Sequence, residues 1–124
     1  MTPTEQQICD TLTAAIKGHN LVQFKYKGTN RIVEPFLIGE LYSIHQVDSE
    51  EGTFALRAWF MRGFTSQPVD RTQSDRWRIY EFKEMVDLVI LDETYKIVRP
   101  LYNQDDRKFK RINYRVVSKQ SAGL

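Results

Sequence analysis

Residues 57–78 contain arginines interleaved with tryptophans. These side chains are the best candidates in the sequence for contacting a ligand. This block has five arginines, two tryptophans and two aspartates. The arginine guanidinium is a planar fork of five donors that pairs with phosphate or carboxylate and stacks on aromatic rings. The block therefore suits an anionic or nucleobase-bearing ligand. A solvated strand surface, with arginines lying over aromatic neighbours, would give the same pattern. The residues are Arg57, Trp59, Arg62, Arg71, Arg76, Trp77 and Arg78.

Charge is segregated along the chain although the formal net charge is only +2. Residues 79–95 hold five acidic residues and one lysine, and residues 96–124 hold eight basic and two acidic residues. The densest basic run is 107–111. By charge this run is a candidate nucleic-acid patch, and a solvated helix face is the alternative interpretation. The patch residues are Arg107, Lys108, Lys110 and Arg111.

Histidine and cysteine are too few to form a recognisable catalytic or metal site. The chain has one cysteine, Cys9, and two histidines, His19 and His45, none in a metal-binding spacing. No nucleophile elbow, phosphate loop or dinucleotide fingerprint is present. A hydrolase built on Asp105 and Asp106 ranks last, because carboxylates in the first turn of a helix are explained by the helix dipole. We therefore expect no enzymatic activity, no metal and no cofactor.

Length and hydropathy predict one soluble domain. A chain of 124 residues with 41% hydrophobic residues can bury a single core. No apolar run approaches the roughly 20 residues needed to span a bilayer. The first residues lack the basic and apolar regions of a signal peptide. We expect a cytoplasmic protein with no membrane partner.

Hydrophobic periodicity predicts one helix followed by short strands. Apolar residues recur at helical spacing over residues 4–17, with Thr2 or Thr4 as cap, Gly18 as the stop and Cys9 buried. Alternating or extended segments predict strands at 21–27, 31–38, 41–47, 53–60, 76–82 and 85–91. Pro35 donates no backbone N–H, so its strand lies at an edge, a bulge or a sharp corner.

The fold class that follows is mostly β (α+β): a small Sm-like or SH3-like antiparallel barrel with an N-terminal helix and a C-terminal extension. We expect a helix at 1–18 packed on a barrel at 19–94, followed by an extension at 95–124, all in one structural domain. The turn at 28–30 connects a hairpin, and 63–75 is a long loop.

The extension is expected to begin with a helix and to end in a strand or an arm. Residues 101–109 predict a capped turn into a short helix, with Asn103 as the cap and Phe109 pinning the helix to the barrel. Residues 114–117 form the final strand or arm.

Three short motifs between residues 21 and 91 carry a family resemblance. Arg31-Ile32-Val33-Glu34-Pro35 looks like an R-x-V-E-P strand entry. Residues 54–59 stand in the place of a W-Y-L-x-A-Y motif, with Ala55 replacing the tyrosine. Residues 78–85 align with R-x-F-x-L-x-R-I, keeping Arg78 and placing Glu84 at the second arginine. In these motifs, residues 21–91 resemble the WYL domain family.

The resemblance implies a bacterial ligand-sensing module with a small Sm-like barrel, usually fused to a helix-turn-helix. This chain has only one helix before the barrel, so it resembles a stand-alone module, and direct reading of duplex DNA is not expected. In the family, the tyrosine and the two arginines contribute to a basic ligand pocket. Arg78 is the one of the three that this sequence keeps.

We therefore expect a non-enzymatic regulatory module that binds an anionic small molecule, such as a nucleotide, or a single-stranded nucleic acid. The alternative, which Ala55 and Glu84 motivate, is a protein-interaction or self-assembly module that has lost the pocket. In that case the opposite charge blocks at 79–95 and 96–124 meet across a barrel edge of a homo-oligomer. The expected ligand-binding residues are Arg31, Arg57, Trp59, Trp77, Arg78 and Tyr80.

Overall fold

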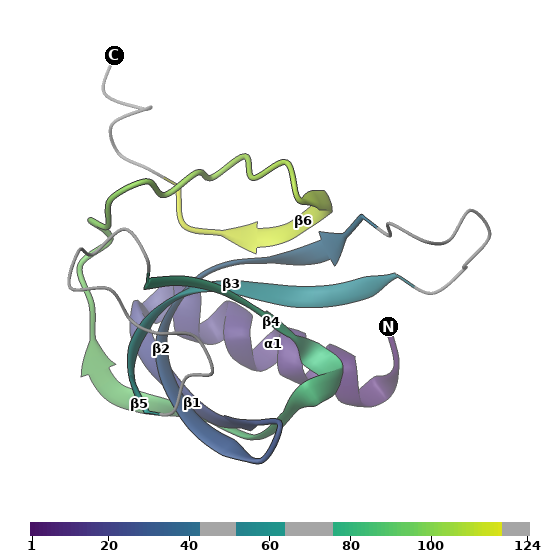
Figure 1. Ribbon diagram of the computed structural model, residues 1–124, viewed down its shortest axis with the longest axis horizontal. Helices are drawn as coiled ribbons and strands as arrows, with labels where there is room; N and C mark the ends of the chain where they lie inside the picture. Colours follow the sequence, from purple (N-terminus) through teal and green to yellow (C-terminus); the bar gives the residue numbers. More distant parts are fainter. Residues whose placement is uncertain (43–51, 64–75, 118–124) are drawn as a thin grey trace.

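Antiparallel strands curled into a small barrel-like sheet, with one helix at the N-terminus, form the described part of the protein (Figure 1). The computed structural model describes residues 1–42, 52–63 and 76–117. Hydrogen-bonded neighbours run in the order β4-β3-β2-β1-β5, and β6 joins β2. The predicted fold class is confirmed. The elements are α1 (Pro3–Gly18), β1 (Asn20–Tyr26), β2 (Thr29–Leu41), β3 (Thr53–Gly63), β4 (Trp77–Glu81), the 3-10 helix η2 (Phe82–Glu84), β5 (Met85–Thr94) and β6 (Phe109–Arg115).

A capping box starts α1, and a left-handed residue ends it. The Thr2 hydroxyl accepts from the Glu5 backbone N–H at 3.1 Å, and the Glu5 carboxylate accepts from the Thr2 N–H at 3.0 Å. His19 follows the helix with φ 53°. The predicted helix is confirmed, with Thr2 as its cap. Its buried face packs into the barrel core through Ile8, Cys9, Leu12, Ala15 and Ile16.

Lys27 and Gly28 form the two-residue turn of the β1–β2 hairpin. Tyr26 pairs with Thr29, and the turn residues have φ values of 51° and 83°. Positive φ at both central positions is typical of a type I′ hairpin turn, and glycine adopts such values without strain. The predicted hairpin is confirmed, but its turn occupies residues 27–28 in place of the expected 28–30.

β2 is the central strand, and it changes register at Pro35. β3 pairs with β2 from Arg31 to Leu41, with a register shift between Pro35 and Leu37. On the opposite edge, β1 pairs with the first half of β2 and β6 pairs with the second half. Of the three positions predicted for Pro35, the structure has the bulge. β3 and β5 extend beyond their predicted ends, to Gly63 and Thr94.

Two hydrogen bonds attach the C-terminal extension to this bulge, and a third lies within the extension. The Val116 N–H donates to the Phe36 carbonyl at 2.8 Å, and the Tyr95 hydroxyl donates to the Pro35 carbonyl. The Tyr102 hydroxyl donates to the Val116 carbonyl at 2.6 Å. The extension is therefore an integral layer of the fold.

Gly39 allows β6 to lie close to β2. A Cβ atom at this position would collide with the Arg111 carbonyl oxygen and press on the Phe109 ring. Any larger residue would push the two strands apart, so the glycine sets the position of β6.

The helix predicted within 101–109 is wrong, because the segment forms turns that lead into β6. The Asn103 side chain accepts from the Asp105 N–H at 2.9 Å, and the Asp106 carboxylate accepts from the Lys108 N–H at 3.0 Å. These side chains close local turns instead of capping a helix. Phe109 is buried as expected, beside Leu37 and Ala55, but on a strand.

Two predicted segments lie partly or wholly outside the described residues. The strand predicted at 41–47 is described only at Leu41, which belongs to β2, and at Tyr42. The loop predicted at 63–75 is described only at Gly63, the last residue of β3. His45 also lies outside the described residues. None of the helical segments in the described ranges has the length and apolarity to cross a membrane.

A buried ion pair ties the segment between β5 and β6, here called the connector (residues 95–108), to β2. Arg99 donates to both carboxylate oxygens of Glu34, at 2.7 and 2.6 Å. The Glu34 side chain is only 2% exposed, and the Arg99 guanidinium lies 4.9 Å from the Trp59 ring centroid. Removing the arginine would leave a buried carboxylate without its partner.

Arg99→Met should therefore lower the free energy of unfolding by about 3 kcal/mol at neutral pH. The double variant Glu34→Gln/Arg99→Met should recover part of that loss, because the buried charge is gone. Urea unfolding measures both. The matched control is Arg62→Met, whose partner Glu93 is 53% exposed, and this variant should leave the midpoint nearly unchanged. Equal losses from the two arginine variants would contradict the prediction.

Candidate functional site

Strand alternation divides the six predicted ligand-binding residues between two faces. Trp59 pairs with Trp77, and Ala58 pairs with Arg78. Successive side chains on a strand point to opposite faces, so Trp59 and Trp77 share one face with Arg57. Arg78 and Tyr80 lie on the other face of β4. The structure therefore does not bring the six residues into one site.

Arg31, Arg78 and Tyr80 form one group, which lies on the inner face of the barrel. Arg31 is 7% exposed, and its guanidinium carbon lies 5.5 Å from the Tyr26 ring centroid and 6.0 Å from that of Tyr80. Its Nε and Nη2 atoms donate to the Thr29 hydroxyl at 3.2 and 3.1 Å. Burial raises the pKa of Tyr80, and the charges of Arg31 and Arg78 act against that rise. Arg31, Arg78 and Tyr80 are thus brought together in a largely buried cluster.

Arg57, Trp59 and Trp77 form the other group, which holds the connector against the barrel. The Arg57 Nε atom lies 3.1 Å from the Asp106 carboxylate, and its guanidinium lies 6.0 Å from the Trp77 ring centroid. Trp77 stacks on Tyr102 at 5.6 Å. Trp59 is 1% exposed and meets Trp77 edge-on at 5.3 Å. Arg57, Trp59 and Trp77 are therefore engaged in packing within the protein.

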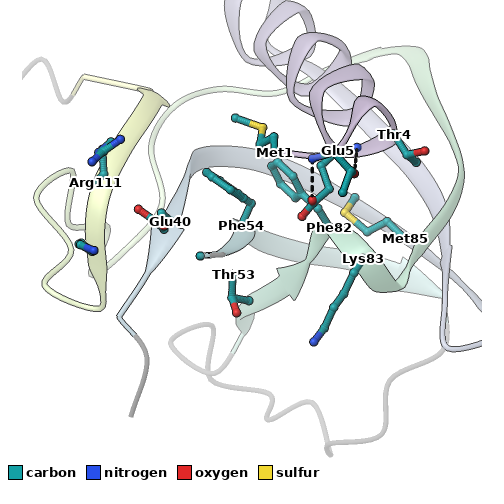
Figure 2. Close-up of a pocket in the computed structure, with 13 residues that line it drawn as sticks. Met1, Thr4, Glu5, Glu40, Thr53, Phe54, Phe82, Lys83, Met85 and Arg111 are labelled. Atoms are coloured by element: carbon teal, nitrogen blue, oxygen red, sulfur yellow. Dashed lines mark hydrogen bonds between the residues drawn. The ribbon is translucent and has the colours of Figure 1, made fainter. Parts of the chain in front are cut away.

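A groove of about 990 Å³ lies elsewhere, between the first turn of α1, the ends of β2 and β3, η2 and β6 (Figure 2). Phe54 and Phe82 form part of its lining, with ring centroids 6.3 Å apart and ring planes 27° apart. Figure 2 shows Met85 and Met1 beside these rings. The groove thus has one apolar, partly aromatic wall, with Phe54 half-buried and Phe82 buried, within a lining that is otherwise mainly polar.

Cations outnumber carboxylates around this groove. Lys83, Lys110 and Arg111 line it, and all three are exposed. Glu5 also lines it, but its carboxylate is used in the capping box of α1. Glu40, half-buried, is paired in register with Arg111 across the β2–β6 ladder. This arrangement suits an anionic group placed next to a planar apolar one.

A smaller hollow of about 460 Å³ lies on the far side of Lys110, which lines both spaces. Tyr42 and Arg107 also line it, together with Asp105 and Asp106. The two carboxylates are neutralised by arginines, Asp105 by Arg115 at 3.0 Å and Asp106 by Arg57. The four basic residues predicted as a patch are all exposed, on a turn and the start of β6, and three of them line one or both hollows: Arg107, Lys110 and Arg111.

The groove residues Phe54, Phe82 and Lys83 were not identified as a site from the sequence. They come from β3 and η2, and they meet Lys110 only because β6 pairs with β2. No spacing within the chain indicates this meeting. Phe54 was recognised only as part of a motif, and the basic run was recognised only by its charge.

Neither a metal site nor a known relative gives further information on function. Within residues 1–42, 52–63 and 76–117, no group of three histidine, cysteine or acidic side chains could hold a metal ion. Comparisons of the chain with family models, curated proteins and solved structures found no match. The functional argument therefore depends on the groove itself.

Four tyrosines should make the folded state less stable at alkaline pH. Burial raises the pKa of Tyr26, Tyr80, Tyr95 and Tyr102 above the ordinary value. In the unfolded chain tyrosines ionise near pH 10, so stability is complete below about pH 10 and falls as the pH rises above it.

We expect Tyr95→Phe and Tyr102→Phe each to make this fall less steep, because one fewer proton is released on unfolding. Urea unfolding at a series of alkaline pH values, with tyrosinate absorbance recorded in parallel, measures the effect. A pH dependence that neither variant changes would contradict the assignment.

Proposed function

We propose that this protein is a non-enzymatic, WYL-like ligand-binding module of the cytoplasm. Its ligand is anionic with a planar part, as in a nucleotide or a short single strand of nucleic acid. The observation that supports this proposal is the groove, which joins the Phe54 and Phe82 rings to the exposed cations Lys83, Lys110 and Arg111.

The two parts of such a ligand have different partners in the groove. A base stacks on an aromatic ring with little dependence on its identity, and Phe54 is the half-buried ring available for this contact. Phosphates are neutralised by Lys110 and Arg111 on β6. The Glu5 carboxylate already accepts from the backbone at the start of α1, so the phosphate is directed to β6 and away from the helix.

The resemblance to WYL domains supports a sensing role. The ligand position that it implies, however, differs from the groove. In this chain Arg31 and Arg78 lie at the inner Tyr80 cluster, and Arg57 pairs with Asp106. The groove cations belong instead to η2 and to the C-terminal strand. The module would therefore use its extension to bind the ligand.

Reversing the β6 charges should weaken binding. Labelled single-stranded DNA and RNA of mixed sequence, measured by fluorescence anisotropy, should bind with an affinity that falls steeply as salt rises. Lys110→Glu/Arg111→Glu should raise the Kd by about tenfold or more at low salt. The matched control Lys27→Glu/Lys96→Glu changes the same net charge at exposed positions outside the groove, and it should have a much smaller effect.

Equal weakening by the two double variants would show attraction to net charge alone and would contradict a groove site. Binding that only Arg78→Ala abolishes would place the ligand at the inner cluster instead. No binding to any strand or free nucleotide at low salt would overturn the proposed ligand class.

Glu40→Gln should act in the opposite direction. It removes a carboxylate from the groove lining without changing the side chain's size, so repulsion of a phosphate is relieved. We expect the Kd at low salt to fall by roughly threefold and the difference to diminish at high salt, because screening weakens the repulsion. Anisotropy titrations of the variant and the wild type check this, and an unchanged Kd at low salt would place the phosphate away from Glu40.

A further inference from the structure

The outer edge of β5 is exposed and apolar. β5 ends the sheet order, with β1 on one side and no described strand on the other. Val86, Val89 and Ile90 are 56%, 48% and 42% exposed. A long edge strand with exposed apolar side chains is a template for adding another strand. This edge therefore needs a partner or a protective feature.

The usual protective features are weak on β5. Its sequence contains neither proline nor lysine. Asp87 has φ 56°, and the β1–β5 register shifts nearby, which disrupts pairing at the start of the strand. A second register shift lies between Ile90 and Thr94, so the regular part of the strand is centred on Val89 and Ile90, and its outer side has no described partner strand.

The charges of β5 oppose pairing with a second β5. In an antiparallel pair centred between Val89 and Ile90, Asp87 of one copy would lie opposite Asp92 of the other. Like charges directly opposite each other destabilise a strand pair. Glu93 adds further negative charge at the end of the strand. A complementary edge must therefore be basic.

β6 provides such an edge. It joins the sheet through β2 alone, and no main-chain hydrogen bond between described residues pairs its other side along 110–115. Its sequence contains three basic residues and no acidic one, and Lys110 and Arg111 are exposed. Figure 1 places β6 and β5 well apart, so the two edges do not meet within one copy.

We propose that the outer edge of β5 pairs with the outer edge of β6 in a second copy of this chain. The contact is head to tail, so repetition produces a closed ring or an open chain. The exposed Asp87 carboxylate lies 3.8 Å from Lys25, and Asp92 is also exposed, so both carboxylates can turn to the incoming lysine and arginine. Lys110 and Arg111 belong both to the groove and to this edge, whereas Val89 belongs to the edge alone, so a Val89 variant tests the strand contact without altering the groove.

Sedimentation velocity of the full chain over a concentration series tests this contact. The mass should rise from monomer to at least dimer with concentration, and less so at high salt. Val89→Lys should keep the protein monomeric, because it puts a cation on the edge that faces β6. The matched control Val98→Lys, at a valine that is 79% exposed in the connector, should assemble like the wild type. Circular dichroism confirms that each variant is folded.

A mixing experiment identifies the partner edge. Val89→Lys keeps an intact β6, and Lys110→Glu/Arg111→Glu keeps an intact β5. Each should be monomeric alone, and an equimolar mixture should form a dimer through the one remaining pair of edges. A charge-reversed variant that still assembles alone, while Val89→Lys does not, would show β5 pairing with itself and overturn the proposal. A wild type that is monomeric at every concentration at low salt would also overturn it.

Discussion

The bulge at Pro35 and Phe36 in β2 is the constraint on which the rest of the protein depends. Proline cannot donate to a ladder, so the register with β3 shifts there. The same edge of β2 then pairs with β1 before the bulge and with β6 after it. The carbonyls of Pro35 and Phe36 accept from Tyr95 and Val116, so the irregularity in the strand becomes the anchor of the extension.

The connector leads from this anchor to β6 and fixes the position of that strand. The Arg99–Glu34 pair and the stacking of Tyr102 on Trp77 hold the connector against the barrel. Gly39 then permits the close approach of the two strands. A buried ion pair and an aromatic stack thus act at a distance on the groove, because they place β6, which supplies two of its cations.

The Arg31-Ile32-Val33-Glu34-Pro35 motif has structural roles in this chain. Arg31 lies against the Tyr26 and Tyr80 rings, Glu34 binds Arg99, and Pro35 sits at the bulge. Each of these contacts fixes the barrel or its extension. These residues therefore determine the architecture, whereas the groove depends on strands outside the motif.

Local signals determined what the sequence could predict: α1 and its Thr2 cap, the β1–β2 hairpin and the irregularity at Pro35. Each depends on residues a few positions apart. At 101–109 the local signals were ambiguous, because asparagine and aspartate can cap a helix or close a turn, and the open edge of β2 favoured the strand. Strand register divided the predicted arginines and tryptophans between two faces. The groove required β3, η2, β6 and α1 together, and only long-range pairing brings those elements to one place.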